Sequence, residues 1–229
     1  TDAAFQDSLD VAATTAVGTL TLANPANILA GKTGNVVVTA ATAGSLAGDV
    51  ALALSSNANG VNGLTTTALT GATVAVTGAA YDLAQASFNT SLALGNVRRG
   101  ASTNFAVGNT VVTSAAFQDS LAVVASSANA ALTLTSPSAI AAGSSGNVGV
   151  TAAGAGSLAG SLNLALTSDA NGVSGLSNVT LAAGNVTVTG AAYDQATATL
   201  ADTAVSFGNV RTGAVRTLGV TNTLAAGGL

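Results

Sequence analysis

Residues 208–213 read GNVRTG, and the run that follows them ends in VTNT at residues 220–223. An earlier copy of this pattern reads GNVRRG at residues 95–100 and ends in VGNT at residues 107–110. A motif that occurs twice, each time followed by a strand-like run, indicates a repeated β unit. The earlier copy continues into more protein, whereas the later one stands almost at the end of the sequence given.

The rest of the chain repeats with nearly the same period. AAFQDSL at residues 3–9 recurs at residues 115–121, and TGAAYD at residues 77–82 recurs at residues 189–194, an offset of 112 residues. Between the two GNVR copies the offset is 113 residues. Length changes are best tolerated in exposed connections, so we expect a domain junction just before each GNVR motif. A period of this length is the size of one β-sandwich domain and too long for a solenoid coil.

Large apolar residues alternate with small or polar ones in several runs, which is typical of antiparallel strands with one buried face. The alternating residues are Leu20, Leu22, Val50, Leu52, Leu54, Val74 and Val76 in the first copy and Leu132, Leu134, Leu162, Leu164, Leu166, Val186 and Val188 in the second. Asn59-Gly60 and Asn171-Gly172 supply turn signals. The sequence therefore predicts an all-β fold of two tandem immunoglobulin-like antiparallel β-sandwich domains, with about seven short strands per copy and a C-terminal donor strand segment. We expect Phe5, Tyr81, Phe117 and Tyr193 to anchor the cores.

Composition excludes several classes of function. Charged residues make up 6% of the chain, with five Lys or Arg against nine Asp or Glu. The few basic residues do not cluster with aromatics, so we expect no nucleic-acid partner. No apolar run approaches 18 residues, so we expect no membrane insertion. A hydrophobic content of 48% argues against disorder, and the rarity of strong helix formers argues against helices.

The sequence offers no catalytic site. It contains no His and no Cys, and all its acidic residues are Asp, with no pair at a telling spacing, so we expect no enzyme activity and no cofactor. Residues 169–172 (DANG) carry oxygen ligands for calcium, but one carboxylate makes a poor cage, so a turn is the preferred reading and no metal is expected. The glycosylation triplets at Asn89, Asn178 and Asn185 are of a kind that arises by chance in a chain rich in Thr, Ser and Asn.

One family resemblance covers nearly the whole chain. Residues 205–213 (VSFGNVRTG), leading to VTNT at residues 220–223, resemble the opening strands of ASH-like sandwich repeats in bacterial surface proteins of the choice-of-anchor type. The AAFQDSL and VTGAAY motifs resemble later strands of the same repeats. The first copy departs from the pattern with Leu94 in place of Phe207 and Arg99 in place of Thr212. The resemblance implies an immunoglobulin-like fold at the cell surface or outside the cell, and no active site.

The phase of the repeat predicts how the chain functions. If a domain opens near GNVR, residues 1–87 form an incomplete sandwich, residues 88–199 a complete one, and residues 200–229 a set of opening strands. A sandwich without its edge strands exposes apolar side chains and unpaired backbone groups, which strand addition from another chain would satisfy. Such a contact is head-to-tail and generates open filaments. We therefore expect a secreted structural subunit of a bacterial filament or sheath whose partner is itself.

Three alternatives stay open at this point. The tail could fold back onto its own first domain, although the middle domain should hold the two apart. The chain could be one period of a longer tandem array, and the sequence does not decide whether successive copies are covalently joined. It could also be an adhesin or ligand-binding module that contacts glycans or surfaces through its loops.

The predicted interface has a donor and an acceptor side. The donor residues are Val205, Phe207, Val210, Arg211, Val215, Leu218, Val220 and Asn222. The acceptor residues are Phe5, Leu9, Val11, Leu20, Val74 and Val76. The arginines on the opening strands, Arg98, Arg99, Arg211 and Arg216, are either solvated edge charges or partners that fix strand register by pairing with Asp7, Asp10, Asp82, Asp119 or Asp194.

Overall fold

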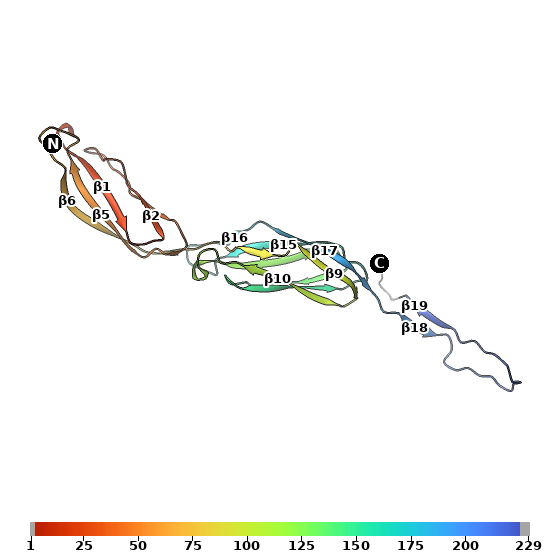
Figure 1. Cartoon of the computed structure of the whole chain (residues 1–229). Coiled ribbons are helices and arrows are strands. Elements are labelled where there is room, and N and C mark those ends of the chain that lie inside the picture. The colour runs from red at the N-terminus through yellow and green to blue at the C-terminus, as the bar shows by residue number, and fades with distance from the viewer. Residues whose placement is uncertain (1–2, 225–229) are drawn as a thin grey trace.

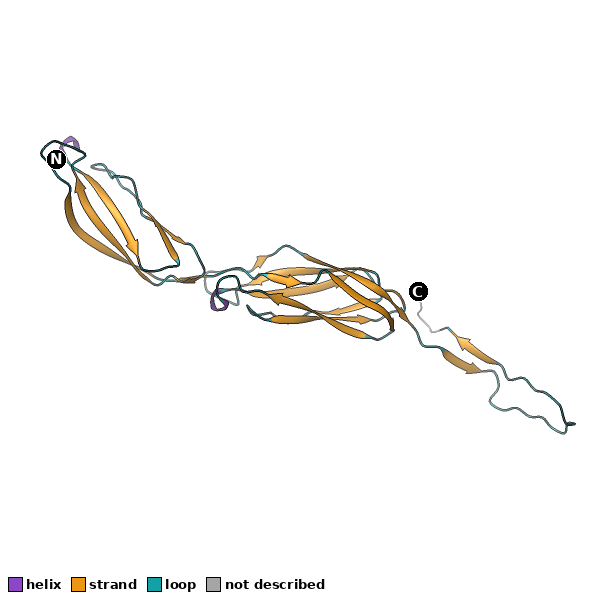
Figure 2. Ribbon diagram, viewed as in Figure 1, coloured by secondary structure: helices purple, strands orange, loops and turns teal. Residues whose placement is uncertain are grey.

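The computed structural model describes residues 3–224 of the chain. Three parts follow one another in a row: domain 1 (residues 3–81), domain 2 (residues 82–195) and a tail hairpin (residues 196–224) (Figure 1). Strands dominate all three, and the helical elements of the described chain are two 3-10 turns, η1 (Ala3–Phe5) and η2 (Ala115–Phe117) (Figure 2). The predicted all-β class with antiparallel sheets is confirmed, and the immunoglobulin-like detail stays a prediction. No helix in residues 3–224 is long and apolar enough to cross a membrane.

Domain 2 is a sandwich of two sheets. One sheet has the order β12 (Leu132–Thr135), β13 (Ser145–Ala152), β10 (Ser102–Asn109), β8 (Ala86–Phe88). The other has the order β11 (Ser120–Ser127), β15 (Gly160–Asp169), β17 (Gly184–Tyr193), β14 (Gly156–Ser157), with β16 (Val179–Thr180) on β15 and β9 (Ser91–Arg98) on β17. The β9–β17 pair is parallel, and the other pairs described in this domain are antiparallel. The opening segment of domain 2 therefore serves both sheets, because β8 and β10 enter one and β9 enters the other.

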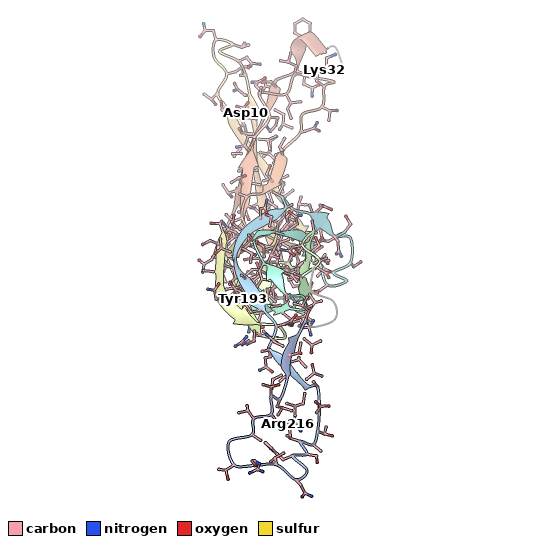
Figure 3. The ribbon with its side chains drawn as sticks, turned by 90° about the vertical axis from the view of Figure 1, so that its right-hand side faces the viewer. Asp10, Lys32, Tyr193 and Arg216 are labelled. Atoms are coloured by element: carbon pink, nitrogen blue, oxygen red, sulfur yellow. The ribbon has the colours of Figure 1, made fainter. Side chains whose placement is uncertain are left out.

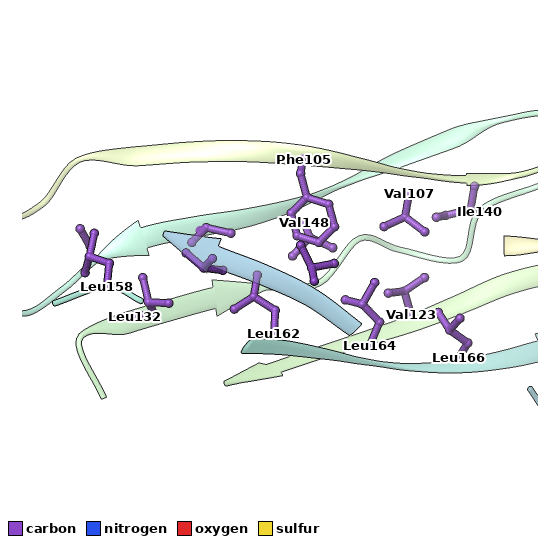
Figure 4. Packing of buried hydrophobic residues seen from close by; sticks show 14 of the residues in the cluster. Phe105, Val107, Val123, Leu132, Ile140, Val148, Leu158, Leu162, Leu164 and Leu166 are labelled. Atoms are coloured by element: carbon purple, nitrogen blue, oxygen red, sulfur yellow. The ribbon is translucent and has the colours of Figure 1, made fainter. Parts of the chain in front are cut away.

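The core of domain 2 lies between the two sheets (Figure 4). Its layers are the alternating residues that the sequence indicated: Leu162 and Leu164 of β15 and Val186 of β17 are fully buried. From the other sheet Val107 of β10 and Val148 of β13 close the core, also fully buried. Aliphatic side chains thus fill most of the interior, together with Phe105 of β10.

Domain 1 repeats this architecture in part. Its strands form three small sheets: β1 (Ser8–Thr15), β5 (Gly48–Asn57) and β6 (Thr67–Val76); β2 (Leu20–Ala23) and β3 (Val37–Ala40); and β4 (Gly44–Ser45) and β7 (Ala79–Ala80). Strand registers match those of domain 2, since Leu52 lies opposite Ala72 as Leu164 lies opposite Gly184. What domain 1 lacks is a counterpart of the opening strands β8, β9 and β10.

The Asn-Gly turns form as predicted, but inside longer connections. Asn59 and Gly60 have φ angles of 53° and 78°, and the amide of Val61 donates to the carbonyl of Ala58 at 3.1 Å. Both central residues need the left-handed region that Asn and Gly tolerate best. The turn opens the connection at residues 58–66 and does not join β5 directly to β6. Among the described residues, no group of three or more His, Cys, Asp or Glu is placed to hold a metal ion.

The expectation that four aromatic residues anchor the cores is wrong. Phe5 is 86% exposed and Tyr193 is 53% exposed. Tyr81 and Phe117 are half-buried and stack on one another, with ring centroids 5.7 Å apart. Tyr81 ends domain 1 and Phe117 belongs to domain 2, so this pair joins two domains. The aromatic residues of these motifs lie at domain ends because the thin cores are already filled by Leu and Val.

Candidate subunit interface

Equivalent residues differ sharply in exposure between the two domains. Val150 and Val186 of domain 2 are 1% and 0% exposed, whereas their counterparts in domain 1, Val38 and Val74, are 43% and 50% exposed. In domain 2 both residues belong to one buried cluster with Phe105 and Val107 of the opening strand β10. Domain 1 therefore presents an uncovered apolar interior along the side where its opening strands would lie.

Two sheet edges are free in the described part of domain 1. In domain 2, β10 pairs along β13 from Ser102–Thr151 to Gly108–Ser145, and β9 pairs along β17. The counterpart of β13 would span residues 33–40, but β3 is only the last four of these residues. Among the described residues, the backbone of residues 33–36 has no ladder partner, whereas the equivalent residues of β13 pair with β10. Unpaired strand edges of this kind are templates for strand addition.

The outer end of domain 1 is hollow. A cavity of about 480 Å³ is lined by Phe5, Gln6, Asp7, Ser8, Leu9, Ser56 and Leu69. The same place in domain 2 is filled by its own opening segment, where the amide of Ala84 donates to Ser168 Oγ at 2.8 Å and Gln118 Nε2 donates to Asn109 Oδ1 at 3.0 Å. The cavity has the position and the polar rim of a site that an opening segment occupies.

The tail hairpin reproduces the pairing of the opening strands of domain 2. It consists of β18 (Thr197–Leu200) and β19 (Val220–Thr223), with Val220 opposite Leu200 and Asn222 opposite Ala198. In domain 2 the corresponding pairs are Val107 with Phe88 and Asn109 with Ala86. The paired residues of the two hairpins are therefore equivalent, and in the described chain the tail hairpin has no domain around it.

The apolar side chains of the tail hairpin have no core to enter. Figure 3 shows this hairpin projecting from domain 2, with Arg216 on the projecting part. Its exposed large apolar residues are Leu200, Val205, Phe207, Val210, Val215, Leu218, Val220 and Leu224. Counterparts of six of them, Phe88, Leu92, Leu94, Val97, Phe105 and Val107, belong to the core of domain 2 or pack against it. Soluble surfaces rarely expose apolar residues at this density, and such a surface marks a binding segment.

Asn109 shows what the end of the tail hairpin is equipped to do. This residue is 1% exposed and donates from Nδ2 to the carbonyls of Asp119 and Ile140 at 3.0 and 3.1 Å. Its Oδ1 accepts from Gln118 Nε2 and from the amide of Gln85, both at 3.0 Å. Its counterpart Asn222 is exposed. Domain 1 holds the matching residues, because Gln6, Asp7 and Ile28 stand at the positions of Gln118, Asp119 and Ile140.

The arginines of the opening strands in domain 2 contact an aspartate that has a counterpart after domain 1. Arg99 Nε lies 2.9 Å from Asp194 Oδ1, and Arg98 Nη1 donates to the carbonyl of Asp194 at 3.1 Å. Asp82, directly after domain 1, is the counterpart of Asp194, and its Oδ2 atom is buried with no hydrogen-bond partner in the described chain. Arg211 of the tail hairpin is the counterpart of Arg98. Of the predicted charge partners, the structure thus brings Arg98 and Arg99 to Asp194.

The predicted donor and acceptor residues lie at opposite ends of the molecule, with domain 2 between them (Figure 1). Among the acceptors Leu20 is buried, Leu9, Val11 and Val76 are half-buried, and Val74 and Phe5 are exposed. These assignments stay predictions. Sequence reasoning missed Gln6, Ile28, Ala72 and Leu200, although the repeated AAFQDSL motif already placed Gln6 beside Phe5.

Strand pairing gives finer limits to the expected domains. The GNVR motif at residues 95–98 lies inside β9, and the junction between domains lies earlier, where the amide of Asp82 donates to the carbonyl of Phe117 at 2.9 Å. The length difference between the copies falls in the connection that follows β8 or β18. The divisions at 1–87, 88–199 and 200–229 stay predictions, and residues 1–2 and 225–229 lie outside the described residues.

Comparisons with known proteins assign no family. No family model matches the chain, and no curated protein matches it. Among solved structures, domains 4–9 of the surface layer protein SbsC align over 96% of this chain and 28% of that one, with 16% identity and a TM-score of 0.34. The endo-fucoidan hydrolase MfFcnA4 of glycoside hydrolase family 107 aligns over 82% of this chain and 24% of that one, with 13% identity and a TM-score of 0.28. The chain spans about a quarter of the length of these structures, and at these scores neither likeness assigns a function.

Proposed function

We propose that this chain is a structural subunit of an extracellular filament or sheath on a bacterial surface, in which the tail hairpin of one copy completes domain 1 of the next. One observation carries the proposal. The tail hairpin has the register of the β8–β10 pair and displays its apolar residues uncovered, while domain 1 lacks the strands that this pair contributes to domain 2. The tail hairpin is therefore a second copy of the strands that domain 1 lacks.

Domain 2 supplies the register of the proposed contact. Transferring its pairs places Leu218 of the hairpin opposite Val36 of domain 1 and Val220 opposite Gly34, in an antiparallel ladder. Residues 204–211 would run parallel to β6 and β7, as β9 runs parallel to β17. Both free edges of domain 1 would then be paired, and β3 would extend toward the eight residues of β13.

Each apolar side chain of the hairpin would leave water for a core. Full burial of a Val, Leu or Phe side chain contributes about 1.5–3 kcal/mol, and the hairpin exposes eight such residues, six of which have counterparts in or against the core of domain 2. Association and ordering of the hairpin oppose this gain. Because β18 and β19 are already paired, part of that ordering cost is met before the copies meet, which favours tight binding.

The ends of the molecule support a head-to-tail arrangement. At the junction inside the chain, Tyr81 stacks on Phe117, and the amide of Asp119 donates to the carbonyl of Asp82 at 3.0 Å. The counterparts are Tyr193 and Asp194 at the C-terminal end of domain 2, and Phe5 and Asp7 at the N-terminal end of domain 1. Tyr193 of one copy would stack on Phe5 of the next, so every junction along the filament would be alike. A head-to-tail contact between two different surfaces need not close into a ring, and where it does not close it propagates into an open filament.

Truncation at residue 196 tests the proposal. Full-length and truncated chains are compared for polymer by electron microscopy and sedimentation, while circular dichroism follows the folding of domain 2, whose core contains no residue of the hairpin. We expect the truncated chain to stay monomeric with domain 2 folded. Filaments that persist after this truncation contradict the proposal. The mass of dissolved polymer under denaturing conditions separates non-covalent subunits from successive periods of one longer polypeptide.

A further inference from the structure

The chain carries two equivalent hairpins and two equivalent domains, so the hairpin of domain 2 could also pair with domain 1. Residues 85–110 belong to domain 2, yet they have the shape that domain 1 lacks. Repeat proteins commonly misassemble through such exchanges. The side chains at the contact between β8 and β17 differ between the copies in a way that bears on this choice.

In domain 2 a large residue meets a glycine. Phe88 of β8 packs over Gly184, and a methyl group built on Gly184 would overlap the phenyl ring, with the two Cε atoms at 3.0 and 3.1 Å. Phe88 is half-buried and packs against the core cluster, so the ring has restricted room to move away. Gly184 is therefore required for Phe88 to lie where it does.

In domain 1 and the tail hairpin, the residue at the position of Gly184 is larger and the residue at the position of Phe88 is smaller. Ala72 stands at the position of Gly184, as its pairing with Leu52 shows, and Leu200 stands at the position of Phe88, as its pairing with Val220 shows. The added methyl group of Ala72 is matched by the smaller side chain of Leu200. The two positions belong to opposite ends of the chain, and they lie far apart within one molecule (Figure 1).

We infer that Phe88–Gly184 and Leu200–Ala72 are two matched pairs that make each hairpin selective for its own domain. This inference rests on the proposed function. Ala72 excludes residues 85–110 of the same chain from domain 1, and the groove accepts the tail hairpin of a second copy. The pairs thereby direct the molecule toward assembly and away from internal exchange.

A second difference in size points the same way. Domain 2 contains a cavity of about 100 Å³ lined in part by Leu94, Thr103 and Val150. Phe207 replaces Leu94 in the tail hairpin, and Leu218 replaces Phe105. Three positions therefore differ in size between the hairpins. The opening segment of domain 2 has Phe88, Leu94 and Phe105 there, and the tail hairpin has Leu200, Phe207 and Leu218.

Exchange of the pair in the full-length chain tests the inference. Leu200→Phe places a phenyl ring against Ala72, and overpacking of this kind raises the critical concentration for polymerisation about tenfold or more. Ala72→Gly in the same chain removes the methyl group, and we expect the double variant to return to within about threefold of the original. Leu200 is 53% exposed in the monomer, so its replacement leaves the domains folded, which thermal melting checks.

The outcomes separate this inference from the proposed function. Polymerisation of Leu200→Phe at the original critical concentration, or failure of Ala72→Gly to rescue it, overturns the selectivity of the pair. Polymer formed by the chain truncated at residue 196 overturns the proposed function instead. The mirror experiment lies within domain 2: Gly184→Ala lowers its melting temperature, and Phe88→Leu in addition recovers part of the loss. A neutral Gly184→Ala variant contradicts the steric premise.

Discussion

The rings of Tyr81 and Phe117 lie 5.7 Å apart at 60° across the junction between domain 1 and domain 2. Aromatic pairs in this geometry contribute about 0.5–1.5 kcal/mol beyond the area that they bury. Their counterparts, Tyr193 and Phe5, are both exposed. The proposed assembly pairs them between copies, and this gives the first prediction.

Tyr193→Ala raises the critical concentration for polymerisation by up to about tenfold, because the stack at each subunit junction is lost. Tyr193→Phe keeps the ring and keeps assembly near the original level. Tyr81→Ala serves as the matched control, since it loosens the junction within the chain and leaves the contact between chains in place. Equal assembly of Tyr193→Ala and the unaltered chain, measured by sedimentation, would argue against this junction.

Arg211→Ala weakens assembly about tenfold. Its counterpart Arg98 donates to the backbone carbonyl of Asp194 at 3.1 Å, Asp82 stands at the position of Asp194, and hydrogen bonds to charged groups contribute about 1.5–3 kcal/mol. The matched control is Arg216→Ala on the same hairpin, whose counterpart Thr103 has no carboxylate partner among the contacts of domain 2. We expect the effect of Arg211 to persist in the Asp82→Asn background, because the proposed acceptor is the backbone carbonyl of Asp82. The same loss for both arginines would indicate general edge charge.

Asn222→Asp abolishes assembly at concentrations about tenfold above the original threshold. Its counterpart Asn109 donates to two backbone carbonyls in a buried site, and a carboxylate of the same shape would turn both donations into repulsions. The monomer is unaffected, since Asn222 is exposed there. Thr221→Val on the same strand is the control for a change of side chain outside this site. Sedimentation of the two variants at several protein concentrations provides the measurement.

The same substitution lowers the free energy of unfolding by different amounts in the two domains, as Leu164→Ala in domain 2 and Leu52→Ala in domain 1 test. Leu164 is fully buried in a complete core, so its truncation lowers the free energy of unfolding of domain 2 by about 2–5 kcal/mol. Leu52 is half-buried in the open domain 1, so the same change costs less in the monomer. In polymer we expect Leu52→Ala to cost about as much as Leu164→Ala. Chemical denaturation of monomer and polymer compares them, and equal costs in the monomer would contradict an open groove.

Sequence patterns predicted the fold class because they report local preferences. Alternation in runs such as residues 50–54 requires strands with one buried face, and the repeat of AAFQDSL requires two copies of one unit. The donor role of residues from Val205 to Asn222 was predicted from this phase alone, and it stays a prediction. The aromatic positions were misread, because burial between successive domains and burial inside a core leave the same signal in a sequence.

The sequence by itself determined that the chain is all-β, that it contains two copies of one unit, and that its tail repeats an opening segment. Only the tertiary structure decided how that segment is used: as a hairpin paired Leu200 to Val220, with its apolar residues uncovered. It also showed that Asp82 Oδ2 is buried without a hydrogen-bond partner among the described residues and that Phe88 lies against Gly184. The physical reason is that pairing register, packing volume and charge neighbours arise between residues far apart in the chain, where a local pattern holds no information.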